Sequence, residues 1–193
     1  MALTLKNGAD GGAYELKIDK DNRAHVEALV LTQQHVISEN EEGAYQAISV
    51  KAVAASELKI LLLKNNSDTQ NLVITYLRME TIGVAAANAS ALWKIYLGGD
   101  YASGGTAITP TNMHVNSTKA ATGAFYDATA STIVTSGTPI EIDRNYQSNG
   151  HIVYNKQGSV ILPKNGVLTM SYTGSTVAGT AFCRASFYYD TPS

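Results

Sequence analysis

Hydrophobic and polar residues alternate along much of this chain. In residues 92–97 (LWKIYL), Trp93 and Ile95 fall on one side, and Lys94 and Tyr96 fall on the other. Strict alternation of this kind is typical of a β-strand with one buried face, because successive side chains point to opposite sides of a strand. The segment is followed by a Gly-Gly pair that ends the pattern. We therefore predict a strand at 92–97.

Further strands are predicted along the rest of the chain. Residues 58–64 (LKILLLK) form a run that is apolar on both faces. Other strands are expected at 72–82, 140–144, 158–162, 167–172 and 181–189. Turn-forming Asn, Ser, Asp and Gly residues separate these segments. The PKNG sequence at 163–166 predicts a hairpin between its flanking strands, because Asn-Gly accepts positive φ angles.

The middle of the chain differs from these segments in amino-acid composition. Residues 106–137 are rich in Thr, Ala, Ser and Asn and contain only short apolar pieces, which predicts short strands joined by polar loops. The Ala-rich segment 85–91 fits a loop or one helical turn. The pattern gives about eight or nine strands and no long helix. We therefore expect an all-β fold, a single jelly-roll-like β-sandwich over residues 56–193.

Residues 1–55 do not follow this regular series. They hold a Gly-rich turn at 8–12, a polar run at 19–23 and an acidic stretch at 38–42. The segment 24–31 (AHVEALVL) fits a strand as well as a helical turn. We interpret residues 1–55 as an extended N-terminal arm with one or two strands that lies on a neighbouring subunit. A terminus without fixed structure is the alternative.

Composition narrows the classes of partner. The chain has 193 residues, only 16% of them charged, and a net charge of −2. It therefore lacks the basic patch that a nucleic-acid-binding protein needs to displace counterions from phosphates. No apolar run approaches the roughly 20 residues of a membrane span, and the first residues do not resemble a signal peptide. We expect neither nucleic acid nor membrane as a partner, and synthesis in the cytoplasm.

Signatures of catalysis or cofactor binding are absent from the sequence. There is no nucleophile elbow, phosphate-binding loop, dinucleotide fingerprint or zinc-protease motif. The paired glycines 98–99 and 104–105 are expected in turns. The histidines have no metal-ligand spacing with one another or with the single cysteine; they are His25, His35, His114 and His151.

Asp19, Asp21 and Asn22 resemble the first residues of a calcium-binding loop. Such a loop requires Gly at its sixth position and Glu at its twelfth, but this sequence has Ala24 and Val30 there. We therefore predict no catalytic, cofactor-binding or metal-binding residue, no cofactor and no enzymatic activity. A carboxylate pair of the glycosidase type cannot be recognised from sequence, so a polysaccharide hydrolase remains an alternative.

Cys183 and the tyrosines are the remaining residues of interest. Cys183 alternates with apolar residues in the segment 181–189, which predicts a small buried core residue rather than a reactive thiol. Tyrosine occurs 11 times against three phenylalanines. Tyrosine suits subunit interfaces and sugar-binding platforms, and also ordinary strand faces. The tyrosines expected near the surface are Tyr96, Tyr101, Tyr126, Tyr146 and Tyr154.

Several short segments of this sequence resemble those of a group of small structural proteins of tailed bacteriophages. The resemblance covers about residues 56–190. It lies in the residue pattern and in several short segments rather than in a catalytic motif. The segments are 61–66 (LLLKNN), 92–99 (LWKIYLGG), 104–113 (GGTAITPTNM), 137–144 (GTPIEIDR) and 184–189 (RASFYY), with 21–23 (DNR) in the arm.

The resemblance implies a virion protein with a jelly-roll fold. It implies a capsid decoration or cement protein, or a head-fibre subunit, that acts through protein–protein contacts. The implied partners are the major capsid protein or neighbouring structural subunits, and a homo-oligomer, with a trimer favoured. A carbohydrate- or receptor-binding module at the tail or neck is the alternative, suggested by the tyrosines near 96–101 and 146–154.

Overall fold

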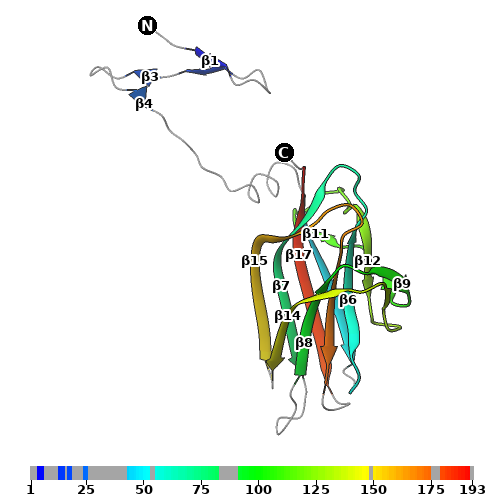
Figure 1. Cartoon of the computed structure of the whole chain (residues 1–193). Helices are drawn as coiled ribbons and strands as arrows, with labels where there is room; N and C mark the ends of the chain where they lie inside the picture. Colours follow the sequence, from blue (N-terminus) through cyan, green and yellow to red (C-terminus); the bar gives the residue numbers. More distant parts are fainter. Residues whose placement is uncertain are drawn as a thin grey trace. The chain divides into compact units, whose positions relative to one another are not determined.

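The computed structural model describes residues 4–6, 13–15, 17–18, 24–25, 43–52, 55–82, 91–147, 150–174 and 179–191. All regular elements among these residues are β-strands, which confirms the prediction of an all-β fold (Figure 1). The chain divides into two compact units, Met1–Thr32 and Gln33–Ser193.

The described residues of the first unit form four very short strands. Strand β1 (Thr4–Lys6) pairs antiparallel with β2 (Ala13–Glu15), and β3 (Lys17–Ile18) pairs antiparallel with β4 (Ala24–His25). Each pair is a separate two-stranded sheet. The acidic stretch 38–42 and the candidate calcium loop at 19–22 lie outside the described residues.

The second unit is built from eight long strands. They are β5 (Ala44–Ala52), β6 (Leu58–Asn65), β7 (Asn71–Ile82), β8 (Ala91–Leu97), β14 (Ile140–Gln147), β15 (Gly150–Leu162), β16 (Val167–Thr173) and β17 (Thr180–Asp190). Five short strands lie between β8 and β14. They are β9 (Asp100–Ser103), β10 (Thr106–Ala107), β11 (Thr111–Asn112), β12 (Gly123–Asp127) and β13 (Val134–Ser136).

The long strands form two antiparallel sheets with jelly-roll connectivity. One sheet has the order β10-β12-β6-β16-β8-β14, and the other has the order β11-β5-β17-β7-β15. The first four long strands pair with the last four in reverse order, β5 with β17, β6 with β16, β7 with β15 and β8 with β14. The chain is thus one long hairpin rolled into two sheets, which defines a jelly roll.

Side chains from both sheets fill the core between them. The Trp93 ring on β8 meets the Tyr172 ring on β16 edge-on, with centroids 4.8 Å apart. On β17, Cys183 and Phe187 are buried on the same face, as the alternation at 181–189 predicts. Burial raises the pKa of the Cys183 thiol. The prediction that Cys183 is a small core residue is confirmed.

Residues 98–139 form an insertion between β8 and β14. Its strand β12 extends the six-stranded sheet beside β6, and its strand β11 extends the five-stranded sheet beside β5. Other parts of the insertion pack on the outer side of β6 and β16, where Leu62, Ala128, Ile133 and Val167 form a second small core. This packing explains why residues 58–64 are apolar on both faces: the outer face of β6 is also covered.

Two expectations from the sequence differ from the structure. The PKNG segment does turn the chain, with Asn165 at φ 63° and the Gly166 N–H donating to the Pro163 carbonyl at 2.7 Å. The flanking strands are not a hairpin, however, because β15 pairs with β7 in one sheet and β16 pairs with β6 and β8 in the other. In addition, strand β5 pairs with β17 and belongs to the sandwich. The domain boundary predicted at residue 56 had placed this strand in the N-terminal arm.

Candidate functional site

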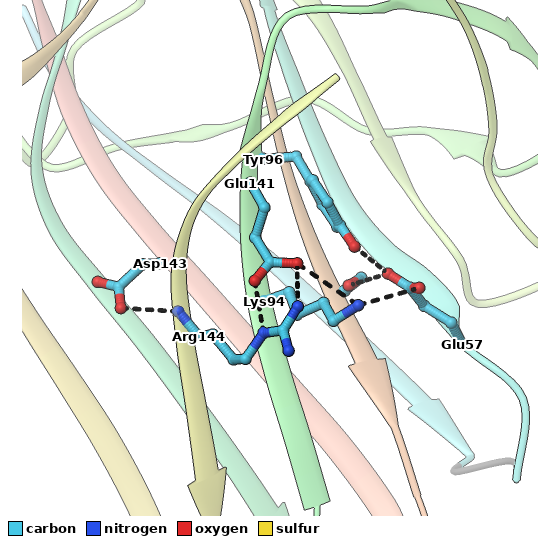
Figure 2. A network of polar contacts seen from close by, with 7 residues as sticks. Glu57, Lys94, Tyr96, Glu141, Asp143 and Arg144 are labelled. Carbon is cyan, nitrogen blue, oxygen red and sulfur yellow. Dashed lines mark hydrogen bonds and ion pairs between the residues drawn. The ribbon is translucent and has the colours of Figure 1, made fainter. Parts of the chain in front are cut away.

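The outer face of the six-stranded sheet carries a connected network of charged and polar side chains (Figure 2). Strand β8 contributes Lys94 and Tyr96, strand β14 contributes Glu141, and Glu57 precedes β6. The Lys94 ammonium lies 3.7 Å from Glu57 Oε2 and 3.5 Å from Glu141 Oε2. Lys94 therefore stands between two carboxylates that are far apart in the sequence.

Hydrogen bonds hold both carboxylates in place. Tyr96 and Ser171 donate their hydroxyl groups to Glu57 Oε1 at 2.8 and 2.7 Å. Arg144 donates through Nε and Nη2 to the two oxygens of Glu141 at 2.5 and 2.9 Å. Such a bidentate arginine–carboxylate pair fixes the relative orientation of the two groups better than a single hydrogen bond does. The network thus joins three strands of the sheet, β8, β14 and β16, to the residue that precedes β6.

The electrostatics of the network keep its groups charged. Burial raises the pKa of the Glu57 carboxyl, but hydrogen bonds from Ser171 and Tyr96 and the charge on Lys94 outweigh burial, so that pKa lies below its ordinary value. The hydrogen bond from Arg144 lowers the pKa of Glu141. The hydrogen bond with Tyr96 raises the pKa of Lys94, whose charge is also favoured by Glu57 and Glu141.

These pKa shifts bear on acid–base chemistry at the network. A glycosidase needs one carboxylic acid that stays protonated near neutral pH. Glu57 and Glu141 are both held ionised by cations and hydrogen bonds, so neither is such an acid. The arrangement is suited to cross-linking strands across the sheet.

The two long edge strands, β14 in one sheet and β15 in the other, have irregular pairing and carry charged residues. Among the described strands, β14 is an edge strand paired with β8, and its register shifts between Glu141 and Asp143. Among the same strands, β15 is an edge strand paired with β7, and its register shifts between Asn155 and Val160. Bulges and charged side chains both discourage edge-to-edge pairing with another chain. These edges are therefore poor sites for β-strand addition.

The five tyrosines expected near the surface do not form one platform. Tyr146 is 64% exposed on β14, whereas Tyr96 belongs to the network. Tyr101 and Tyr126 stack on each other within the insertion, with ring centroids 3.8 Å apart. Tyr154 is partly buried against the main core. A single tyrosine-lined surface is therefore not present among these five residues.

Three of the four histidines lie among the described residues. His25 lies in β4, His151 lies in β15, and His114 is exposed in the loop after β11. His35 lies outside the described residues. In the part of the chain that the structure describes, no three His, Cys, Asp or Glu side chains are placed to hold a metal ion. No helix among these residues is long and apolar enough to span a membrane.

The outer face of the five-stranded sheet was not anticipated from the sequence. Four large apolar side chains are exposed there, Ile48 and Val50 on β5 and Val153 and Ile161 on β15, with exposed fractions of 38, 43, 45 and 51%. We call this surface the apolar face. Its signal in the sequence is the segment 44–52 (AYQAISVKA), in which the outward positions also include apolar residues.

Comparison with known proteins does not place the chain in a family. No model of a known protein family matches the sequence, and no curated protein is detectably similar to it. The fold and surface alone therefore define the class of the molecule. It is a jelly-roll β-sandwich with a charge-balanced polar network on one outer face and exposed apolar side chains on the other.

Proposed function

We propose that this chain is a structural virion protein of a tailed bacteriophage, a capsid decoration or cement protein or a head-fibre subunit. The observation that carries the proposal is the apolar face, where Ile48, Val50, Val153 and Ile161 are exposed on a regular sheet. Large apolar side chains exposed on the solvent side of an antiparallel sheet, where polar residues are usual, are suited to protein–protein contacts.

Two further features support a role in assembly. The polar network offers ionised side chains that are already paired with one another, which suits a rigid scaffold. The resemblance to small phage structural proteins covers the segments that form most of the sandwich. On this proposal the partners are the major capsid protein or neighbouring structural subunits, the protein forms a homo-oligomer with a trimer favoured, and it resides in the virion.

Immunogold electron microscopy of phage particles, with antibody raised against this chain, tests the proposal. Gold over the capsid surface would support a decoration or head-fibre role. Gold at the tail tip or neck would favour the alternative below. If intact particles are not labelled and their denatured proteins lack the chain, the virion proposal is wrong.

A carbohydrate- or receptor-binding module at the tail or neck is the second candidate. Tyr146 favours it, because its ring is 64% exposed on the same strand as the Glu141–Arg144 pair. An exposed aromatic ring beside hydrogen-bonding groups is suited to sugar contacts. A glycan array with the full chain, Tyr146→Ala and the control Ile140→Ala tests it. Signals lost only in Tyr146→Ala would support this candidate, and no binding by the full chain would contradict it.

A further inference from the structure

The outer face of the five-stranded sheet has two arginines at its centre. Leu77 and Cys183 belong to the core, so the residues that follow them, Arg78 on β7 and Arg184 on β17, point outward. These arginines are directly opposite each other on neighbouring strands, and we call them the arginine pair. Like charges in such a position destabilise a sheet unless anions lie near them.

The two arginines differ in their partners. Arg78 donates through Nη2 to Glu80 Oε2 at 2.7 Å, whereas the Arg184 guanidinium lies over the Phe182 ring, 5.6 Å from its centroid. Arg184 has no hydrogen-bond or ion-pair acceptor among the described residues. Cations elsewhere on the sandwich contact a carboxylate; they include Lys64, Lys94, Arg144, Lys156 and Lys164. The described part of the sandwich therefore leaves Arg184 without an anion.

The charge at this place favours a carboxylate as the ligand. The arginine pair and Glu80 carry two positive charges against one negative charge, so one further negative charge balances them. A carboxylate supplies one charge, whereas a phosphate monoester carries nearly two at pH 7. A guanidinium that rests on an aromatic ring is also held in one orientation, and its planar edge matches a carboxylate.

Apolar side chains lie on both sides of the arginine pair. One row across the sheet runs from Ile48 on β5 through Arg184 and Arg78 to Val153 on β15. Ile48 and Val153 are 38 and 45% exposed. Because neighbouring strands are about 4.8 Å apart, these two apolar residues are separated by about 14 Å.

This spacing fits an extended peptide that crosses the strands. In an extended peptide, alternate residues point to the same side, and residues four positions apart are separated by about 14 Å. An acidic residue at the centre of such a segment reaches the arginine pair. The residues two positions before and after it then lie over Ile48 and Val153, so aliphatic side chains are favoured there.

We propose that the arginine pair binds an Asp or Glu side chain of a different protein. The acidic residue lies in an extended segment with an aliphatic residue two positions before it and another two positions after it. No Asp or Glu of this chain has aliphatic residues at both positions, which favours a different protein over a second copy. The proposal goes beyond the proposed function, because it holds wherever the protein resides.

Nuclear magnetic resonance titration of the isotope-labelled full chain tests the proposal with two capped peptides, LSESL and LSQSL. The peptides differ only in the charge of the central residue. We expect LSESL to shift the side-chain signals of Arg78 and Arg184, and to bind at least about ten-fold more tightly than LSQSL. This comparison uses the unaltered protein, so it does not depend on the folding of a variant.

Substitutions of Arg184 provide the second test. Arg184→Gln should abolish the preference for LSESL, and Arg184→Lys should keep only part of it, because lysine retains the charge but cannot form a bidentate pair. The matched control is Lys164→Gln, which removes a cation from the exposed pair with Asp68 and should bind LSESL like the wild type. Thermal unfolding should show Arg184→Gln to be about as stable as the wild type, because the change removes the opposed like charges.

Several outcomes would overturn the proposal. Equal binding of the two peptides, or no shift of any signal up to about 10 mM peptide, would show that no carboxylate site exists here. Inorganic phosphate that binds as tightly as LSESL would mean a general anion site. Self-association of the wild type that Arg184→Gln abolishes, measured by sedimentation, would make a second copy the occupant. Particle labelling decides the virion proposal separately.

Discussion

At the scale of single residues, buried and half-buried polar groups in this sandwich are placed where several strands meet. Lys94 contacts carboxylates from two other segments, and Asn65 connects the turn before β7 to the end of β15. Such groups stabilise the fold only while their partners are present, because removing one partner leaves the others desolvated without compensation. Two substitutions follow from this reasoning.

Glu57→Gln is expected to make stability less dependent on pH. The pKa of Glu57 in the folded protein lies below the ordinary value of 4.5. Its ionised form therefore stabilises the fold above about pH 4.5, and this contribution is lost as the pH falls through the lowered pKa. In urea unfolding, the variant should be less stable than wild type by about 0.5–1 kcal/mol at pH 7 and equal to it near pH 3. The control is Asp68→Asn at the exposed pair with Lys164, where we expect little change at pH 7. A deficit in Glu57→Gln that persists at pH 3 would contradict the assignment.

Asn65→Ala is expected to destabilise the end of the sandwich. The Asn65 side chain is fully buried, donates to the carbonyl groups of Gln70 and Leu162 at 2.8 and 2.9 Å, and accepts from the Ser67 N–H at 2.9 Å. Alanine leaves these groups unsatisfied, with an expected loss of about 2–3 kcal/mol in the free energy of unfolding. The exposed neighbour provides the control, Asn66→Ala, with an expected change within about 0.5 kcal/mol. Equal effects of the two changes would show that the side chain of Asn65 is not the cause.

At the scale of elements, the insertion depends on a glycine turn after β9. Gly104 has φ +73°, and a Cβ there would overlap the backbone carbonyl of Thr132. Gly98 has a similar φ of +80°, but a Cβ there would meet nothing within 4 Å. A glycine can be required by its backbone conformation or by the close approach of a neighbouring atom. Gly98 has the first requirement alone, and Gly104 has both.

Gly98→Ala and Gly104→Ala should therefore differ clearly in stability. We expect Gly98→Ala to lose about 1 kcal/mol, which is the penalty for alanine at positive φ. Gly104→Ala must also move the backbone near Thr132, so we expect a loss of about 3 kcal/mol or more. Thermal unfolding measures both losses, and hydrogen exchange should show the extra loss concentrated in residues 98–139. Similar losses in both variants would mean that the close approach to Thr132 is easily relieved.

The elements also show which features a sequence can predict. The strands at 92–97 and 181–189 and their buried faces were predicted correctly, because alternation is a local consequence of strand geometry. The hairpin at 163–166 was not, because turn residues reverse the chain but do not determine which sheet receives the next strand. The network around Lys94 was missed for a related reason: Glu57 and Glu141 meet it only through the topology of the sheet.

At the scale of the whole molecule, the two units differ in their capacity to fold alone. The described strands of Met1–Thr32 form two-stranded sheets, whereas Gln33–Ser193 contains the jelly roll and its core. Isolated two-stranded sheets are at best marginally stable in water. A large sandwich core, by contrast, supports independent folding.

A peptide of residues 1–32 is therefore expected to be unfolded by circular dichroism. A chain that begins at residue 33 should keep the unfolding free energy of the full chain within about 1 kcal/mol, because its core is intact. Urea unfolding of the two chains provides the measurement. A large loss of stability in the shorter chain would mean that the first unit contributes to the fold of the sandwich.

Strand β17 lies between β5 and β7 in the middle of the five-stranded sheet, yet it is the last strand of the sandwich in the chain. The ribosome therefore delivers both neighbours long before it delivers the strand that joins them. Until the codons for residues 180–190 have been translated and the segment has left the exit tunnel, the sheet has a gap at its centre. The jelly roll is consequently completed only after most of the chain has been synthesised, and a message cut short before these codons yields no folded sandwich.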